Sequence, residues 1–373
     1  MVKIDKVDVG SFPLLLAPME DVSDPPFRVL CKEFGADVVY TEFISSEGLI
    51  RSADKSVQKL DIYDEERPVG IQIFGSEIES MRMCARIVEQ AQPEFLDINY
   101  GCPVKKVAGK GAGAGILKDI CKMESLTREI VQSTDLPVTA KTRLGWDEKT
   151  IRIQEVALRL QDAGIKALSI HGRTRKQMYK GEADWTQIGE VAAHPDIEIP
   201  IFGNGDVDSP QKALLMRETY PVQGIMIGRA SIGYPWIFRE IKHFFETGET
   251  LAPPTIQERV DVCKRHFLMS MEWKGERLTL FEMRRHYTAY FKGIPNFKPY
   301  RMKLVNSNDV QEILETLDIV GETFNPDDPN SAQIGGMEGT KSAKFINLGP
   351  IRSGDSVKEW LKVPALQDLK NAK

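Results

Sequence analysis

Short apolar runs recur along the amino-terminal part of the chain, and each run ends in a polar or glycine-containing segment. Between the runs lie stretches with apolar residues at helical spacing, such as residues 81–89, 123–132 and 153–163. An alternation of this kind is typical of parallel βα units. The eight runs predict strands at residues 14–17, 38–41, 69–73, 95–98, 138–141, 167–170, 201–203 and 224–227.

Eight βα units predict a (β/α)₈ or TIM barrel, in which the strands close on themselves inside a ring of helices. The alternative is an open doubly wound sheet, whose phosphate-binding glycines should follow the first strand. Residues 17–20 read Ala-Pro-Met-Glu and contain no glycine. Glycines instead gather at residues 109–115, after a Cys-Pro turn, where we expect a mobile lid over the site.

The βα rhythm stops after Trp236, and a helical pattern continues to about residue 319, with Pro253 and Pro254 as a break at its start. The segment 324–350 is rich in Asn, Asp, Pro, Ser and Gly, which indicates irregular structure. We therefore expect a barrel domain at 1–240, a smaller all-helical domain at 241–322 and an irregular C-terminal extension at 323–373.

Composition narrows the class of protein. The 373 residues contain no apolar run near the roughly 18 residues that a membrane span needs, and the first residues lack the apolar core of a signal peptide. Five cysteines, odd in number and without any Cys-x-x-Cys pair, argue against a disulfide framework and against a zinc site. We expect a cytoplasmic protein with reduced thiols and no bound metal.

The net charge of −5 does not indicate a nucleic-acid binder, but one stretch differs from the rest. Between residues 277 and 303, seven cations stand against a single acid, Glu282, and six aromatic residues lie among them. Alternating cations and rings suit phosphate contacts combined with base stacking. A basic helix face with its aromatic residues turned to a core gives the same pattern, so both interpretations stay open.

Residues 97–104, which read DINYGCPV, hold a cysteine between a glycine and a proline at the end of a predicted strand. Barrel enzymes keep their active sites at the carboxyl ends of their strands, so Cys102 is a candidate for chemistry. The alternative is a small buried hydrophobic residue in a tight turn.

Polar or glycine residues follow nearly all the predicted strands, which describes a mouth built for a polar ligand. The loops after the last two strands, with Asn204-Gly205-Asp206 and Gly228-Arg229, suit a phosphate group. Lys141 could be a Schiff-base nucleophile, a fixed cation beside a cofactor or a surface lysine. His171 could be a general base, a phosphate contact or a loop histidine.

The motifs APM, VGIQIFG, DINYGCPVKKV, KTRLGW, SIHGRTR, FGNGD and MIGRA resemble those of the flavin-dependent tRNA-dihydrouridine synthases over about residues 12–320. The resemblance implies a barrel that binds FMN and a helical domain that helps to hold tRNA. It also implies reduction of the C5–C6 bond of selected uridines to 5,6-dihydrouridine, with NADPH or NADH re-reducing the flavin.

The resemblance further implies roles for individual residues. Cys102 would be the general acid. The cofactor-binding residues would be Pro18, Met19, Gln72, Lys141, His171, Asn204, Gly205, Asp206, Gly228 and Arg229. The substrate contacts would be Asn99, Arg143, Arg173, Arg284 and Arg285.

Two departures from the family pattern stand out. The first loop reads PMEDVSD, where the family more often has a small residue and a glycine after PM, so the flavin contacts near Glu20 and Asp21 stay open. The C-terminal extension matches no part of the pattern. Two other functions are possible: a flavin barrel acting on a free pyrimidine such as dihydroorotate, and a non-catalytic RNA-binding barrel. We expect a monomer.

Overall fold

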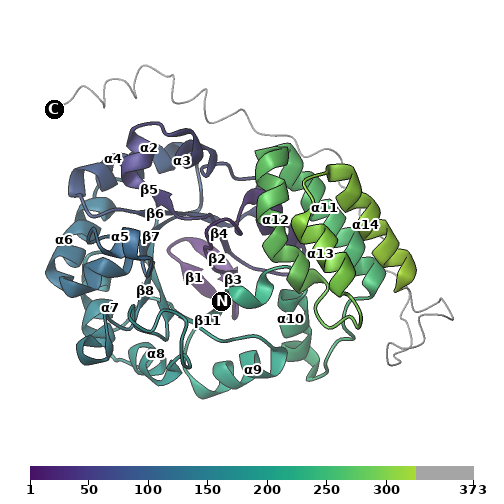
Figure 1. The fold of residues 1–373 in the computed structure, drawn as a ribbon. Helices are drawn as coiled ribbons and strands as arrows, with labels where there is room; N and C mark the ends of the chain where they lie inside the picture. The colour runs from purple at the N-terminus through teal and green to yellow at the C-terminus, as the bar shows by residue number, and fades with distance from the viewer. Residues whose placement is uncertain (325–373) are drawn as a thin grey trace. The chain divides into compact units, whose positions relative to one another are not determined.

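A computed structural model describes residues 1–324 of the chain, which form two compact units. The first unit contains residues 1–231 and 235–251, and the second contains residues 232–234 and 252–324. Eight parallel strands form the centre of the first unit (Figure 1). They are β3 (Leu14–Leu16), β4 (Val39–Tyr40), β6 (Val69–Phe74), β7 (Phe95–Tyr100), β8 (Val138–Arg143), β9 (Ala167–His171), β10 (Ile201–Asn204) and β11 (Gly224–Ile227).

The strands close into a barrel. Each strand from β6 to β11 pairs with its neighbour in the chain, β11 pairs with β3, and β4 pairs with β6. A parallel bridge between Leu15 and Val38 joins β3 to the segment before β4, with the Leu16 N–H donating to the Val38 carbonyl at 2.8 Å. The predicted (β/α)₈ fold is confirmed, and the alternative of an open doubly wound sheet is wrong. A short strand, β5 (Ile44–Ser45), adds to the end of β6.

Helices surround the barrel, and several of them bury one apolar face. In α4, Met81, Cys84, Ala85 and Val88 are buried at helical spacing, which explains the periodicity seen in the sequence. Side chains cap the amino ends of several helices. At the start of α1, for example, the Asp24 carboxylate accepts a hydrogen bond from the Phe27 N–H. The helices are α1 (Pro25–Glu33), α2 (Ser46–Ile50), α3 (Asp54–Gln58), α4 (Ile78–Gln90), α5 (Lys105–Ala108), α6 (Ile120–Val131), α7 (Ile153–Asp162), α8 (Trp185–Ala192), α9 (Pro210–Thr219) and α10 (Ile237–Thr247).

An antiparallel hairpin that the sequence pattern did not predict precedes the barrel. It consists of β1 (Val2–Ile4) and β2 (Val7–Gly10). Ile4 and Val9 join a buried cluster with Phe95 and Ala167, the first residues of β7 and β9. The hairpin therefore covers the amino ends of the strands, and the carboxyl ends form the open mouth.

The second unit is helical, as the sequence predicted for this region. It contains α11 (Ile256–Lys274), α12 (Glu276–Tyr290), α13 (Lys298–Asn306) and α14 (Val310–Thr323). Its core is aliphatic and aromatic, with Phe267, Tyr287, Leu304 and Leu317 fully buried. Beyond residue 324, the predicted irregular extension lies outside the described residues. Within residues 1–324, no helix is both long enough and apolar enough to cross a membrane.

Candidate active site

The carboxyl ends of the barrel strands bring the predicted site residues of the first unit to one mouth. Gln72 lies on β6, Asn99 on β7, Lys141 and Arg143 on β8, His171 on β9 and Asn204 on β10. Most of these side chains are buried although they are polar. Buried polar groups need hydrogen-bond partners, and the structure supplies them within the mouth.

Cys102 lies in a tight turn at the end of β7. The Asn99 side-chain oxygen accepts from the N–H groups of Gly101 at 3.0 Å and Cys102 at 2.8 Å, which fixes the turn. Cys102 is 6% exposed. Burial raises the pKa of its thiol, and this effect outweighs the lowering by the charges of Arg143 and Lys141. The thiol is therefore protonated at neutral pH and can donate a proton.

The glycine-rich segment, where the sequence predicts a mobile lid, packs against this turn. Residues 113–118 form a 3₁₀ helix, and the Ala114 N–H donates to the Cys102 carbonyl at 3.0 Å. Gly113 has a positive φ of 52°, and a Cβ atom there would lie 3.0 Å from the Cys102 Cβ. The glycine permits close packing around the thiol.

Lys141 is a second group with unusual surroundings. Its Nζ donates to the Asn204 side-chain oxygen at 3.2 Å, and the Asn204 amide donates to the Met226 carbonyl at 2.7 Å. Burial and the nearby Arg143 lower the pKa of Lys141 to about 8, so the ammonium form predominates at neutral pH. An ammonium has three N–H donors, and among the described residues Asn204 is the hydrogen-bond acceptor found for it. Lys141 can therefore donate to a bound molecule.

Positive charge gathers around His171. Burial holds its pKa well below the ordinary value, and four cations add to the effect: Arg143, Lys141, Arg173 and Arg229. The neutral imidazole faces a mouth that suits an anionic group such as a phosphate.

Asp206 balances part of this charge. Arg173 donates to both of its carboxylate oxygens, at 2.9 and 2.7 Å, and Arg229 donates to one at 2.9 Å. Burial alone would raise the pKa of Asp206, but the hydrogen bonds from Arg173 and the Ala183 N–H lower it. Arg173 also donates to the carbonyls of Lys180 and Gly181. The buried Arg173 guanidinium thus already has several hydrogen-bond acceptors within the protein. Its contact with the substrate stays a prediction.

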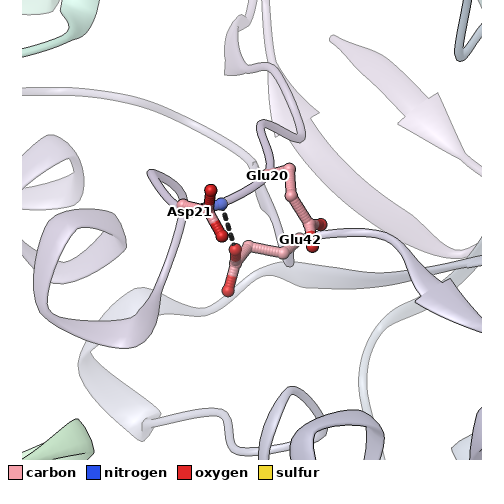
Figure 2. Close-up of side chains that lie close together, drawn as sticks. All are labelled: Glu20, Asp21 and Glu42. Atoms are coloured by element: carbon pink, nitrogen blue, oxygen red, sulfur yellow. Dashed lines mark hydrogen bonds between the residues drawn. The ribbon is translucent and has the colours of Figure 1, made fainter. Parts of the chain in front are cut away.

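The first loop, whose sequence departs from the family pattern, has a left-handed backbone conformation at one residue. Asp21 has a φ of 54°, in the left-handed region that glycine adopts most readily and aspartate tolerates. Its N–H donates to the Glu42 carboxylate, as the dashed line in Figure 2 shows. Burial raises the pKa of Glu42 to about 7, and Lys59 lies 2.7 Å from the Glu20 carboxylate and 3.8 Å from Glu42. Lys59 thus balances part of the negative charge of Glu20 and Glu42.

Pro18 and Met19 begin this loop, and both are half-buried. The Met19 N–H donates to the Ser23 hydroxyl at 2.9 Å, and the Ser23 N–H donates to the Met19 carbonyl at 3.0 Å. These bonds hold the loop at the end of β3. The remaining predicted cofactor residues, Gly205 and Gly228, lie in the loops that follow β10 and β11.

Sequence reasoning missed Tyr179, which lies in the loop after β9 and is 52% exposed. The guanidinium carbons of Arg143 and Arg229 lie 5.7 and 5.2 Å from its ring centroid. Arg143 also donates to the Met178 carbonyl at 2.8 Å. The sequence of residues 171–179, HGRTRKQMY, could have indicated this residue, since it combines cations with an aromatic residue directly after a strand.

The two predicted substrate arginines of the helical unit lie on α12. Arg285 is exposed, whereas Arg284 is half-buried and donates to the Asn308 side chain at 2.9 Å. Arg277, Phe281 and Arg285 are exposed at intervals of four residues, so they share one helix face. We call these three residues the α12 basic face.

Comparisons with known proteins agree with the geometry. A family model described as "Dihydrouridine synthase" matches residues 15–325. The "tRNA-dihydrouridine synthase B" of Pseudomonas putida is 39% identical over 299 residues, covering 80% of this chain and 88% of the relative. The "Probable tRNA-dihydrouridine synthase 1" of Synechocystis is 38% identical over 317 residues, covering 84% and 88%.

Among solved structures, the 6-hydroxypseudooxynicotine amine oxidase of Pseudomonas geniculata N1 aligns with a TM-score of 0.51 at 11% identity. The alignment covers 69% of this chain and 52% of that one. A likeness at this identity shows a shared barrel fold.

Proposed function

This chain belongs to the dihydrouridine synthase family, and we propose on that basis that it reduces the C5–C6 double bond of uridines in tRNA to 5,6-dihydrouridine. FMN is the proposed bound cofactor, and NADPH or NADH is the proposed electron donor. The observation that carries the proposal is the Cys102 thiol, which is buried at the barrel mouth, where the charges of Arg143 and Lys141 act on it. Such a thiol suits a general acid better than a nucleophile, which needs a lowered pKa.

The donor set of the mouth fits FMN. The cations around His171 suit its phosphate, and Arg229 with Gly205 and Gly228 lies in the loops where barrels hold phosphate groups. The donor capacity of Lys141 suits a ring nitrogen or carbonyl. When bound and reduced, FMN supplies the hydride for C6 of the uracil. The residues proposed to hold it are Pro18, Met19, Gln72, Lys141, His171, Asn204, Gly205, Asp206, Gly228 and Arg229.

The chain's own residues account for the proton. The Cys102 Sγ–H donates its proton to C5 of the uracil, where negative charge would otherwise develop. The thiolate that remains lies in the field of Arg143 and Lys141, which stabilises it. Asn99 and Arg143 are proposed to face the base, with Tyr179 at the exposed edge of the mouth.

The remainder of the tRNA needs a cationic surface. Lys105, Lys106 and Lys110, around α5, are exposed, and we propose that they contact phosphates. In the helical unit, the α12 basic face combines two arginines with an exposed ring, as single-stranded or looped RNA favours. Arg284 and Arg285 remain proposed substrate contacts. The proposal is of a cytoplasmic monomer.

The first test compares the wild type with Cys102→Ala. The variant should keep its FMN and oxidise NADPH slowly, but its dihydrouridine yield should fall by about 10² or more, because a positioned general acid contributes roughly that much. Cys121→Ala removes an exposed thiol from α6 and should behave as the wild type. The product is measured by mass spectrometry of nucleosides from unmodified tRNA. A normal yield from Cys102→Ala would remove this thiol from the mechanism.

Flavin content, tRNA binding and turnover of dihydroorotate, measured on the same purified protein, distinguish the two other functions. A flavin-loaded protein that ignores tRNA but turns over dihydroorotate would indicate a small-molecule enzyme. A colourless protein that binds tRNA would indicate a non-catalytic RNA-binding barrel.

A further inference from the structure

A carboxylate with no part in the proposed reaction lies beneath the Cys102 turn. Asp97 is on β7, two residues before Asn99, and is 2% exposed. Its two oxygens accept from the Thr139 hydroxyl and from the Gln72 amide nitrogen, each at 2.6 Å. Residues two apart on a strand point to the same face, so Asp97 and Asn99 both reach Gln72 on the adjacent strand β6.

The hydrogen bonds continue from Asp97 to the thiol loop. The Gln72 side-chain oxygen accepts from the Asn99 amide at 2.8 Å, and the Asn99 oxygen accepts from the N–H groups of Gly101 and Cys102. We call Asp97, Gln72 and Asn99, with these two N–H groups, the amide chain. A carboxylate only accepts and a backbone N–H only donates, so a single orientation of both side-chain amides satisfies the whole chain.

We propose that Asp97 is a positioning residue: its carboxylate fixes the orientation of the Gln72 and Asn99 amides and thereby holds the Cys102 turn in place. This inference rests on the proposed function of Cys102 as the proton donor.

The energetics of burial support this role. Without an acceptor at position 97, the fully buried Gln72 amide nitrogen loses a partner, and a buried donor left unsatisfied is costly. Rotation of Gln72 toward another acceptor would turn its oxygen away from Asn99 and loosen the turn. Burial raises the pKa of Asp97 to about 6, so the residue is mainly a carboxylate at neutral pH.

The test uses two variants of position 97. Asp97→Leu has no acceptor, whereas Asp97→Asn can still accept from Gln72 if the Thr139 hydroxyl turns to accept from the new amide. The rate of Cys102 alkylation by iodoacetamide is measured in the purified protein by peptide mass spectrometry, together with kcat and KM for unmodified tRNA. Cys84, which is fully buried behind the barrel wall on α4, reports global unfolding.

Asp97→Leu should change the alkylation rate of Cys102 at least fivefold and lower kcat at least tenfold, with the KM for tRNA within twofold and Cys84 still protected. Asp97→Asn should stay within threefold of the wild type in every measure. A wild-type alkylation rate and kcat in Asp97→Leu would overturn the proposal.

If Asp97→Leu exposes Cys84, Gln72→Met interrupts the amide chain at its next member. The same change in Cys102 alkylation is expected, and a wild-type rate would overturn the proposal. The alkylation readout needs no turnover. If Cys102 responds as expected in a protein that makes no dihydrouridine, the positioning role stands and the proposed function fails.

Discussion

Loss of charge from Glu66 should destabilise the barrel unit more than any exposed substitution. Arg28 and Glu66 are 1% and 0% exposed, and the Arg28 guanidinium donates to both carboxylate oxygens. Arg28 also donates to the carbonyls of Ser23 and Asp61, each at 2.8 Å. Glu66→Gln removes the carboxylate that pairs directly with this buried guanidinium and leaves only the weaker interactions with the charges of Asp24 and Glu42.

The magnitude follows from the burial of the pair. Removal of one partner of a buried ion pair costs roughly 3–5 kcal/mol of unfolding free energy, out of a total of about 5–15 kcal/mol for a domain. A unit of this size loses about 2–4 °C in Tm per kcal/mol, so Glu66→Gln should melt roughly 6–20 °C lower. Because Arg28 holds Ser23, the loop of residues 19–24 should also loosen and retain less flavin.

The assay is thermal and urea unfolding followed by circular dichroism. Glu65→Gln is the matched control, because Glu65 lies in the same 3₁₀ helix but is exposed, and it should change the unfolding free energy by less than about 0.5 kcal/mol. Arg28→Met combined with Glu66→Leu should be milder than Glu66→Gln, since no buried charge is left alone. A Glu66→Gln protein within about 1 kcal/mol of the wild type would refute the reasoning.

Three other predictions test separate features. Asp21→Gly should leave the unfolding free energy nearly unchanged, whereas Asp21→Val should lower it by about 1–2 kcal/mol, because φ at this residue is 54°. Arg285→Glu should weaken tRNA binding and reduce the slope of log K against log salt by about 1, with flavin content unchanged. Burial holds the pKa of His266 well below its ordinary value, so the unfolded chain binds a proton near pH 6.5 that the folded unit does not. Stability should therefore fall below about pH 6.5, more steeply in the wild type than in His266→Asn, in urea titrations at pH 7.5 and 5.5.

Each of these predictions has an outcome that would contradict it. Equal stability of the Gly and Val variants at position 21 would mean that the loop relaxes to another conformation. An unchanged salt slope in Arg285→Glu would place the RNA elsewhere. Parallel curves of stability against pH for the wild type and His266→Asn would mean that the folded unit protonates His266. Glu42 and Asp97, whose raised pKa values change stability in the opposite direction, contribute equally to both proteins, so the difference between the two curves isolates His266.

The barrel could be predicted from the sequence because each of its strands has a local sequence pattern. Each strand is an apolar run that ends in a polar group, and both features can be read within about ten residues. The hairpin at residues 2–10 has a weaker sequence pattern. Its strands are three and four residues long, and its turn contains Asp5, with a φ of 54°, in place of a glycine. Its burial depends on Phe95 and Ala167, which are distant in sequence.

The site was predictable in part for the same reason. Strand ends converge in any barrel, so the positions of Lys141 and His171 at the mouth followed from the fold. Which partners they meet did not follow. The bidentate pairing of Arg173 with Asp206 joins residues 33 apart, and the close packing of Gly113 on Cys102 appears only in three dimensions. Nothing in the sequence around Asp97 indicates its hydrogen bond with Gln72, which lies 25 residues away.

The central claim is flavin-dependent reduction of uridine in tRNA, and the visible absorbance spectrum of the purified protein tests it most directly. Under anaerobic conditions, the flavin bands should bleach when NADPH is added and return when unmodified tRNA follows, because the substrate withdraws the hydride. Bands that bleach with NADPH but ignore unmodified tRNA would contradict the claim, as would a protein with no flavin bands at all.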